Sequence, residues 1–241
     1  MTLRAICFDY GGTLDGPGSH WLPRFARLYA DNGLDVPFAR LREAFGHATR
    51  SGYADPRVAE MDLQGLAVFH VARQLEHLEV DAPDLAARVV SRFVDEARAA
   101  LADSRAVLDR LRHRFRLGVI SNFYGNVERI LSEAGMAAWL SVIVDSNRAG
   151  VSKPDPRIFA LALERLDCAP REAMYAGDSF EKDVVAARAV GWHTAWVIGS
   201  QSPRCPAPEL VDVTVRRLAE LESLPARLLQ ASKERSAKGS R

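Results

Sequence analysis

Several features that would place this chain outside an ordinary aqueous compartment are missing from its 241 residues. Its three cysteines, Cys7, Cys168 and Cys205, are odd in number and widely spaced, which argues against a disulfide framework and a zinc site. No stretch approaches the roughly 20 apolar residues of a membrane span. The N-terminal apolar stretch is too short for a signal peptide and lacks a cleavage region. We therefore expect a cytoplasmic protein without a membrane partner.

Charge of one sign is also lacking, since the formal net charge is only +1. Such a balance gives no general attraction to nucleic acid or to anionic membranes, and we expect neither as a partner. Lysine is scarce: only four of the 32 basic residues are Lys, at positions 153, 182, 233 and 238. Each lysine before the C-terminal tail is therefore a candidate functional residue.

Short apolar runs recur along the chain and are typical of strands buried on both faces of a parallel sheet. Helical periodicity fills most of the intervals between them. This alternation predicts an α/β fold with a doubly wound parallel sheet. The expected strands are 5–8, 117–120, 141–144, 173–176 and 194–198, and the expected helices are 104–114, 125–135, 156–166 and 180–190.

One interval, 16–100, breaks the alternation because it contains no convincing strand. It shows helical patterns near 20–32, 37–50, 60–78 and 83–101. We interpret it as an all-helical cap subdomain inserted into a catalytic core of residues 1–15 and 101–225, with hinges near 15–18 and 100–104. The polar, basic segment 226–241 is predicted to be disordered.

Polar residues follow the predicted strands, and ligands of open parallel sheets bind beyond the carboxyl ends of the strands. Carboxylates there suit Mg²⁺, which prefers oxygen ligands, and a carboxylate can also be a covalent nucleophile toward phosphorus. A lysine, a hydroxyl and backbone N–H groups near glycines would mask the charge of a phosphate. The residues that suggest such a site are Asp9, Gly12, Ser121, Asn122, Asp145, Lys153, Asp178 and Asp183.

Four short motifs in this order resemble those of the haloacid dehalogenase superfamily. They are "DYGGT" (9–13), Ser121 at the end of a hydrophobic run, the pair Lys153–Pro154, and "GDSFEKD" (177–183). Together they extend over roughly three quarters of the chain. The helical insertion after the first motif is similar to that of family members with a helical cap.

The resemblance implies a role for each matched residue. Asp9 would be the nucleophile, and the main-chain carbonyl of Gly11 a metal ligand. Thr13 and Ser121 would position the phosphate, with Gly12 and Asn122 beside them as substrate-binding residues. Lys153 would balance charge in catalysis, and Asp178 with Asp183 would complete a magnesium site. A Mg²⁺-dependent phosphatase acting on a small phosphorylated molecule is therefore the first hypothesis.

Gly11 departs from the family's D-x-D-G-T pattern, in which the second Asp protonates the leaving group and then activates water. General acid–base assistance is typically worth about 10²–10⁴-fold, so aryl or acyl phosphates with good leaving groups are favoured as substrates. Two alternatives stay open: a 2-haloacid dehalogenase, which needs no such acid, and a non-catalytic protein that binds a phosphorylated ligand or a partner. A phosphonoacetaldehyde hydrolase is nearly excluded, since 16–100 contains no lysine for a Schiff base.

We expect any substitute proton donor to come from the cap or from the first hinge. The candidates are Asp15, His20, His47, His70 and His77, and Arg50 and Tyr53 are candidates for contact with the substrate. Neither the substrate nor the oligomeric state can be predicted from the sequence.

Overall fold

The core of the molecule is a six-stranded, fully parallel sheet. A computed structural model of the chain describes residues 3–16, 18–201 and 203–224. The strand order is β3-β2-β1-β4-β5-β6, so the direction of winding reverses between β1 and β4. This confirms the predicted fold class. The strands are β1 (Ala5–Phe8), β2 (Arg116–Ser121), β3 (Leu140–Asp145), β4 (Ala173–Gly177), β5 (His193–Val197) and β6 (Val213–Val215).

Strand β6 is the one strand that the sequence patterns did not predict. It consists of only three residues, and its central Thr214 is exposed while its two valines are buried. A run so short and interrupted by a polar residue gives no periodicity to detect. The position of β6 at the edge of the sheet, beside β5, follows from tertiary pairing.

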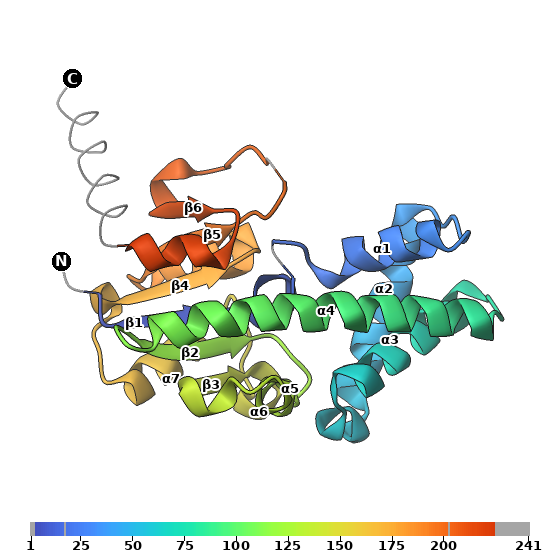
Figure 1. The fold of residues 1–241 in the computed structure, drawn as a ribbon, viewed down its shortest axis with the longest axis horizontal. Coiled ribbons are helices and arrows are strands. Elements are labelled where there is room, and N and C mark those ends of the chain that lie inside the picture. The colour runs from blue at the N-terminus through green and yellow to red at the C-terminus, as the bar shows by residue number, and fades with distance from the viewer. Residues whose placement is uncertain (1–2, 17, 202, 225–241) are drawn as a thin grey trace.

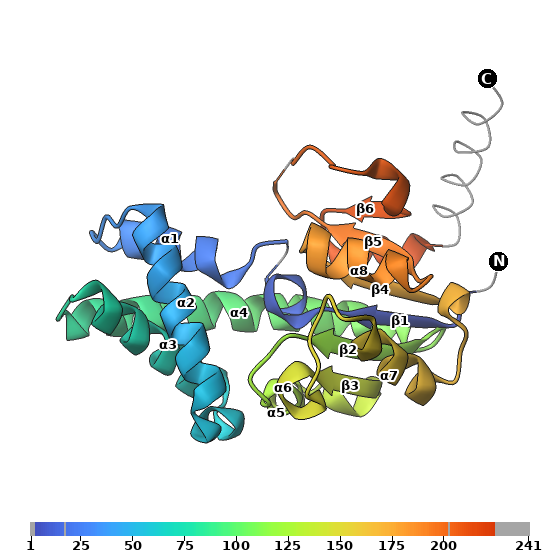
Figure 2. The same cartoon turned by 180° about the vertical axis from the view of Figure 1, so that it is seen from behind.

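Helices cover both faces of the sheet, as Figures 1 and 2 show from opposite sides. Alternate side chains of a strand point to opposite faces. Ile6 and Phe8 of β1 pack in the larger apolar cluster together with residues of α4 and α5. Ala5 and Cys7 face the smaller cluster, which contains residues of α7 and α8. The α-helices are α1 (Trp21–Asp31), α2 (Phe38–Ala54), α3 (Leu63–Leu78), α4 (Pro83–Leu111), α5 (Val127–Glu133), α6 (Ser146–Ala149), α7 (Pro156–Leu166) and α8 (Ala186–Ala189).

Helix α4 joins the helical insertion to the core without a break. Its 29 residues include the predicted helix 83–101 and most of the predicted helix 104–114, which ends three residues early, and the expected hinge at 100–104 lies inside it. After Pro83 the helix has no Gly or Pro, and its central part is rich in Ala, Leu and Arg, which are strong helix formers. The Ser104 hydroxyl also donates a 2.7 Å hydrogen bond to the main-chain oxygen of Leu14, which ties α4 to the loop after β1.

Two of the other predicted helices are shorter than expected. The interval 180–190 begins as a helical turn, η5 (Phe180–Val185), and continues as the short helix α8. Helix α5 occupies only seven residues of the predicted 125–135. Helix α7 has the predicted bounds, with Pro156 in its first turn and the Asp155 side chain accepting a hydrogen bond from the main-chain nitrogen of Arg157.

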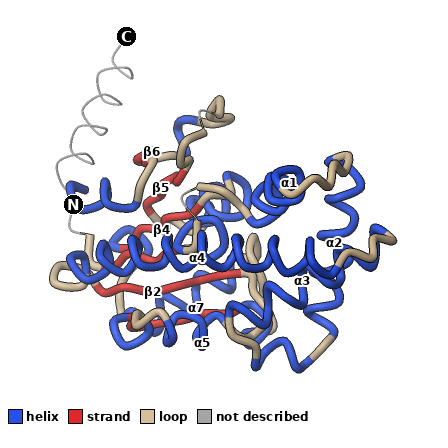
Figure 3. Tube along the Cα trace, turned by 45° about the vertical axis from the view of Figure 1, so that its right-hand side comes forward, coloured by secondary structure: helices blue, strands red, loops and turns tan. Residues whose placement is uncertain are grey.

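Residues 18–82 contain helices and loops but no strand among the described positions, and they lie with the first half of α4 beside the sheet (Figure 3). Their interior is aromatic: Phe25 stacks on Phe93 with ring centroids 4.5 Å apart, and Trp21 meets Phe93 edge to face at 4.8 Å. None of the described helices is long and apolar enough to cross a membrane. The segment 226–241, predicted to be disordered, lies outside the described residues.

Candidate active site

A cavity of about 610 Å³ opens at the carboxyl ends of β1, β2 and β4. It therefore lies at the reversal point of the sheet, where open α/β folds bind their ligands. The core contributes charged and polar residues, and the helical insertion contributes a wall that is mainly aromatic. The core residues include Asp9, Gly11, Ser121, Asn122, Lys153, Asp178, Lys182 and Asp183, and the wall consists of His20, Trp21, Phe45, Thr49 and Tyr53.

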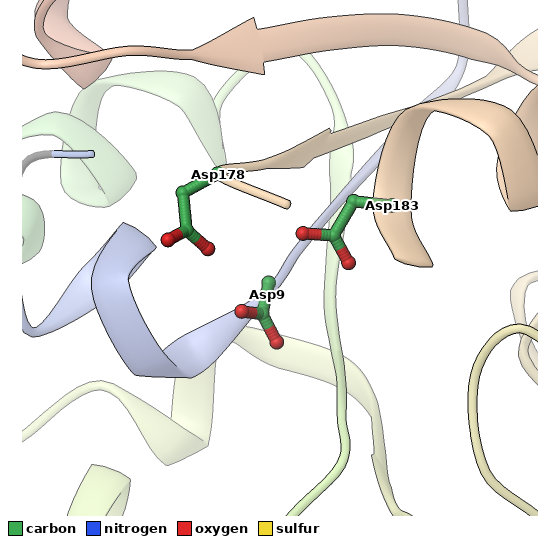
Figure 4. A group of neighbouring side chains, drawn as sticks. All are labelled: Asp9, Asp178 and Asp183. Atoms are coloured by element: carbon green, nitrogen blue, oxygen red, sulfur yellow. The ribbon is translucent and has the colours of Figure 1, made fainter. Parts of the chain in front are cut away.

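Three carboxylates meet in this cavity. Asp9 follows β1 directly, Asp178 follows β4, and Asp183 lies in η5. One oxygen from each lies within 4.8 Å of the others. Figure 4 shows the three side chains converging from these separate elements. The sequence prediction that these acids come together is thus matched by the geometry.

Lys153 lies between two of these carboxylates and is buried. Its Nζ donates hydrogen bonds of 2.8 Å to Asp9 Oδ1, 2.6 Å to Asp183 Oδ1 and 2.9 Å to the Tyr175 hydroxyl. A lysine ammonium has three protons, so its donor capacity is fully used. Burial alone would lower the pKa of Lys153, but the charges of Asp183 and Asp9 outweigh it and raise that pKa, which keeps the side chain charged.

The two oxygens of Asp9 have different surroundings. Oδ1 accepts from Lys153 and, at 2.9 Å, from the Ser121 hydroxyl. Oδ2 accepts no hydrogen bond from any described residue. One oxygen is therefore held in place, while the other is available to a ligand.

The remaining two acids have perturbed acidities. The pKa of Asp178 is raised well above its usual value, first by burial and then by the charges of Asp9 and Asp183. Burial raises the pKa of Asp183 to about 6, against the opposing effect of Lys153. Asp183 also accepts a 2.9 Å hydrogen bond from the main-chain nitrogen of Ser179. Three acids beside a single lysine leave excess negative charge, which a bound cation would offset.

Glycine is required at position 12. Gly12 has φ +89°, and a Cβ there would lie 2.5 Å from Asp178 Oδ2. The backbone therefore approaches the Asp178 carboxylate more closely than any side chain would permit. The Gly12 nitrogen donates a 2.7 Å hydrogen bond to Asp15 Oδ1, which holds the loop in this conformation.

The donor set fits a magnesium ion. Asp178 accepts no side-chain hydrogen bond from the described part of the chain, and Asp9 keeps Oδ2 free, so two carboxylates have lone pairs to offer. Mg²⁺ is usually held by one or two carboxylates together with waters and phosphate oxygen. Both oxygens of Asp183 are engaged, by Lys153 and by Ser179, which suits orientation of a metal-bound water better than direct ligation. Gly11 also lines the cavity, close to these acids.

Asn122 lines the cavity, as expected of a substrate-binding residue, whereas Thr13 does not. The Asn122 amide donates to the main-chain oxygen of Lys153 at 2.9 Å, and its oxygen accepts from the nitrogen of the same residue at 2.7 Å. Asn122 therefore fixes the lysine loop as well as lining the cavity. Thr13 is buried with an unpartnered hydroxyl and lines a separate cavity of about 730 Å³ on another side of the loop after β1.

Only one of the proposed proton donors borders the active-site cavity, namely His20. His70 is buried at the Tyr124 hydroxyl, and burial lowers its pKa to about 3. His47 stacks on His77 in the helical insertion. Asp15 is buried and stabilises the loop after β1, since it also accepts a hydrogen bond from Trp21 and forms an ion pair with Arg24.

Of the two proposed substrate contacts, Tyr53 lines the cavity and Arg50 does not. Sequence reasoning missed Tyr175, the third partner of Lys153. Its hydroxyl donates to the main-chain oxygen of Ile120, which fixes its orientation. The available signal was a polar aromatic residue inside an otherwise apolar strand run.

The fold and the four matched segments together define a class of α/β hydrolases. A family model of haloacid dehalogenase-like hydrolases matches residues 3–191, and the chain belongs to this family. The phosphoserine phosphatase of Thermus thermophilus is 30% identical over 202 residues, which cover 79% of this chain and 81% of that protein.

Solved structures share the fold. A HAD phosphatase from Thermococcus onnurineus superposes with a TM-score of 0.57 and 21% identity over 92% of this chain and 97% of its own. A 2-haloacid dehalogenase from Pseudomonas syringae pv. Tomato DC3000 superposes with a TM-score of 0.51 and 22% identity. The match covers 95% of this chain and 99% of that chain. Both a phosphatase and a dehalogenase are therefore similar in fold, and the choice between these activities depends on the site.

Proposed function

We propose that the protein is a Mg²⁺-dependent phosphatase that acts on a small phosphorylated molecule through a covalent phosphoryl group on Asp9. The observation that carries this proposal is the convergence of Asp9, Asp178 and Asp183, with oxygens within 4.8 Å of one another, around a single lysine. In a hydrolase of this family, a bound divalent cation would neutralise the charge of these clustered carboxylates.

The same acids disfavour the dehalogenase alternative. A 2-haloacid is itself an anion, and the acid cluster of Asp9, Asp178 and Asp183 is an unfavourable environment for it when no cation is bound. Displacement of a halide needs only one nucleophilic carboxylate. Retention of two further acids, one buried and one half-buried, would then cost folding free energy without any catalytic benefit.

In the proposed reaction an oxygen of Asp9 attacks the phosphorus, and the bond from phosphorus to the leaving oxygen breaks with its electron pair remaining on that oxygen. Ser121 and Lys153 hold the nucleophile by their hydrogen bonds to Oδ1. A water then attacks the phosphorus, and the bond from phosphorus to the Asp9 oxygen breaks with its electron pair remaining on Asp9. One proton of the water passes through solvent to the leaving oxygen, so Asp9 is regenerated and inorganic phosphate is released.

Asp9, Asp178 and the main-chain oxygen of Gly11 would hold the magnesium ion, with Asp183 orienting its shell. When bound, the ion supplies electrostatic stabilisation of the charge on the phosphoryl oxygens. Lys153 is the other positive charge at this point of the site and remains tied to Asp9 and Asp183.

Gly11 restricts the leaving group. No carboxylate is available at this position to protonate a poor leaving oxygen, so aryl and acyl phosphates should react faster than alkyl phosphates. An added side chain would have space there, because the nearest atom to a Cβ at Gly11 is Trp21 Nε1 at 3.9 Å. Steric crowding therefore does not explain why position 11 has no acidic side chain.

The decisive experiment measures phosphate release from aryl, acyl and alkyl phosphates with Mg²⁺ and with EDTA, for the wild type and for Asp9→Asn. Turnover that requires both Mg²⁺ and Asp9 supports the proposal, and equal turnover by Asp9→Asn contradicts it. Halide release from 2-chloropropionate in EDTA would instead establish a dehalogenase. Ligand-induced stabilisation of the fold without any turnover would indicate the non-catalytic alternative.

A further inference from the structure

We propose that His20 and Lys182 form a subsite for a carboxylate of the substrate, which would make the substrate a phosphorylated hydroxy acid. This inference rests on the proposed phosphatase function, because it assigns the part of the cavity that the phosphate does not fill. The two residues come from different elements, His20 from the N-terminal end of α1 and Lys182 from η5, and neither is used by the chemistry at Asp9.

Free positive charge in the cavity is confined to one side chain. Among the described lining residues the lysines are Lys153 and Lys182, and no arginine is present. Lys153 donates its three ammonium protons to Asp9, Asp183 and Tyr175. An anionic group of the substrate beyond the phosphate therefore has Lys182 as its one charged partner in this set.

Lys182 is available for that role. Its side chain is exposed at the cavity and forms no ion pair or hydrogen bond with any described residue. Its main-chain nitrogen donates to the Ser179 hydroxyl at 3.3 Å, which anchors the backbone in the turn η5. A cation on a fixed backbone with no protein partner is suited to an anionic ligand.

His20 also lines the cavity, just before α1, and its ring is oriented by two contacts. Nδ1 accepts a 3.3 Å hydrogen bond from the main-chain nitrogen of Leu22, so in the neutral ring Nε2 carries the proton and is a donor. The ring also packs edge to face on Phe45, with centroids 5.6 Å apart.

Its surroundings lower the pKa of His20, which favours the neutral ring. Desolvation by neighbouring protein lowers the pKa of His20 against the opposing charges of Asp9 and Asp15, and the nearby charge of Lys182 lowers it further. Lys182 lines the same cavity as His20. One charged donor and one neutral donor facing a common space match the two oxygens of a carboxylate.

The rest of the cavity offers no carboxylate to a cationic group of the substrate. The carboxylates among its described lining residues are Asp9, Asp178 and Asp183, all assigned to the nucleophile and the cation. None remains to pair with an ammonium group. A phosphorylated hydroxy acid such as 2-phosphoglycolate should therefore be a better substrate than O-phosphoserine.

Binding can be tested without relying on turnover. Titration calorimetry in excess Mg²⁺ would compare 3-phosphonopropionate with propylphosphonate, two non-hydrolysable ligands that differ in one carboxylate. We expect the wild type to bind the carboxylated ligand at least about tenfold more tightly, as a single charge-assisted contact permits. Lys182→Met should reduce that preference to about twofold or less and leave propylphosphonate affinity unchanged.

His20 is tested by a pair of variants, since its loss also removes the cap of α1. His20→Asn can keep both the cap and an N–H donor, so it should retain more of the preference than His20→Ala. The matched control is Arg42→Met, which removes a positive charge from α2 outside the cavity lining and should leave both affinities unchanged.

Three results would overturn the subsite. They are equal binding of the two ligands by the wild type, an undiminished preference in Lys182→Met, and failure of either ligand to bind. Failure of the phosphatase proposal is seen separately, as absence of Asp9-dependent phosphate release. A carboxylate preference in binding without turnover would support the subsite and contradict only the catalytic proposal.

Discussion

The Tyr175 hydroxyl lies 2.9 Å from Lys153 Nζ and accepts the one ammonium proton that the two carboxylates leave over. The same hydroxyl donates to the main-chain oxygen of Ile120, at the end of the neighbouring strand β2. Three strands of the sheet thus fix the lysine: β1 through Asp9, β2 through Ile120 and β4 through Tyr175. The position of the positive charge in the site is set by the sheet itself.

Removal of this hydroxyl should therefore impair catalysis more than folding. For Tyr175→Phe we expect kcat on an aryl phosphate to fall about tenfold with KM nearly unchanged, because Lys153 becomes free to move. The lost hydrogen bonds should cost about 1 kcal/mol of unfolding free energy. Steady-state kinetics and urea unfolding would measure both effects.

Tyr29→Phe is the matched control, since Tyr29 is also buried but its hydroxyl has no partner within the described structure. That substitution should leave kcat unchanged. An equal loss of kcat in both variants would show that the Tyr175 contact does not position the lysine.

Asp178→Asn should stabilise the metal-free protein. Burial and the charges of Asp9 and Asp183 raise the pKa of Asp178 in the folded state. A carboxyl with a raised folded pKa favours folding while protonated and disfavours it once pH exceeds its unfolded value of about 3.9. At pH 7 in EDTA the Asn variant should consequently melt at a higher temperature than the wild type.

The advantage of that variant should disappear at low pH and in Mg²⁺. Near pH 4 the two melting temperatures should converge, because the wild-type carboxyl is then largely protonated. Added Mg²⁺ should raise the melting temperature of the wild type and have little effect on Asp178→Asn. A variant that Mg²⁺ stabilises as strongly as the wild type would show that Asp178 is not a ligand.

Gly11→Asp tests whether the absent acid limits the site. Gly11 has φ −73° and ψ 111°, which an aspartate can adopt, and the surroundings leave space for its side chain. We expect turnover of alkyl phosphates to rise by about 10²-fold or more, within the range of general acid–base catalysis. Aryl phosphate turnover should change much less.

Gly11→Asn provides the comparison for that experiment, because it fills the same space without a titratable group. A similar gain in both variants would mean that packing rather than proton transfer was improved. No gain in Gly11→Asp would mean that another group already handles the proton.

Asp15 should prove to be a structural residue. It is fully buried, accepts from the Gly12 nitrogen and from Trp21, and pairs with Arg24 at 3.5 Å. Asp15→Asn would leave Arg24 without its counter-charge and should cost about 3 kcal/mol of unfolding free energy, as is usual when a buried pair is broken.

The pH dependence of kcat/KM should keep its shape in Asp15→Asn, in contrast to what loss of a catalytic acid would produce. Asp103→Asn, at an exposed acid of α4, should change stability by no more than about 0.5 kcal/mol. If the pH profile of kcat/KM lost its acidic or basic side in Asp15→Asn, Asp15 would be the group that transfers the proton in catalysis.

The sequence by itself determined the sheet and the acids. Buried parallel strands are continuous apolar runs, so the sequence predicted five of the six strands. The polar residues that follow these strands were expected to meet at one edge of the sheet, because the carboxyl ends of parallel strands lie together there. Asp9, Ser121, Lys153, Asp178 and Asp183 follow from that rule and from the four motifs. Periodicity also predicted the helices of the insertion, but it did not predict that α4 continues through residues 100–104.

Only the tertiary structure decided which residues accompany those acids. Contacts such as Tyr175 with Lys153, or His20 with the cavity shared by Lys182, join positions far apart in the chain, and local periodicity does not encode them. The four histidines near the cap were equivalent in sequence, and packing left His20 as the one at the cavity while His70 was buried. At Gly11 the sequence showed that an acid is absent, and the structure added that the space for one remains.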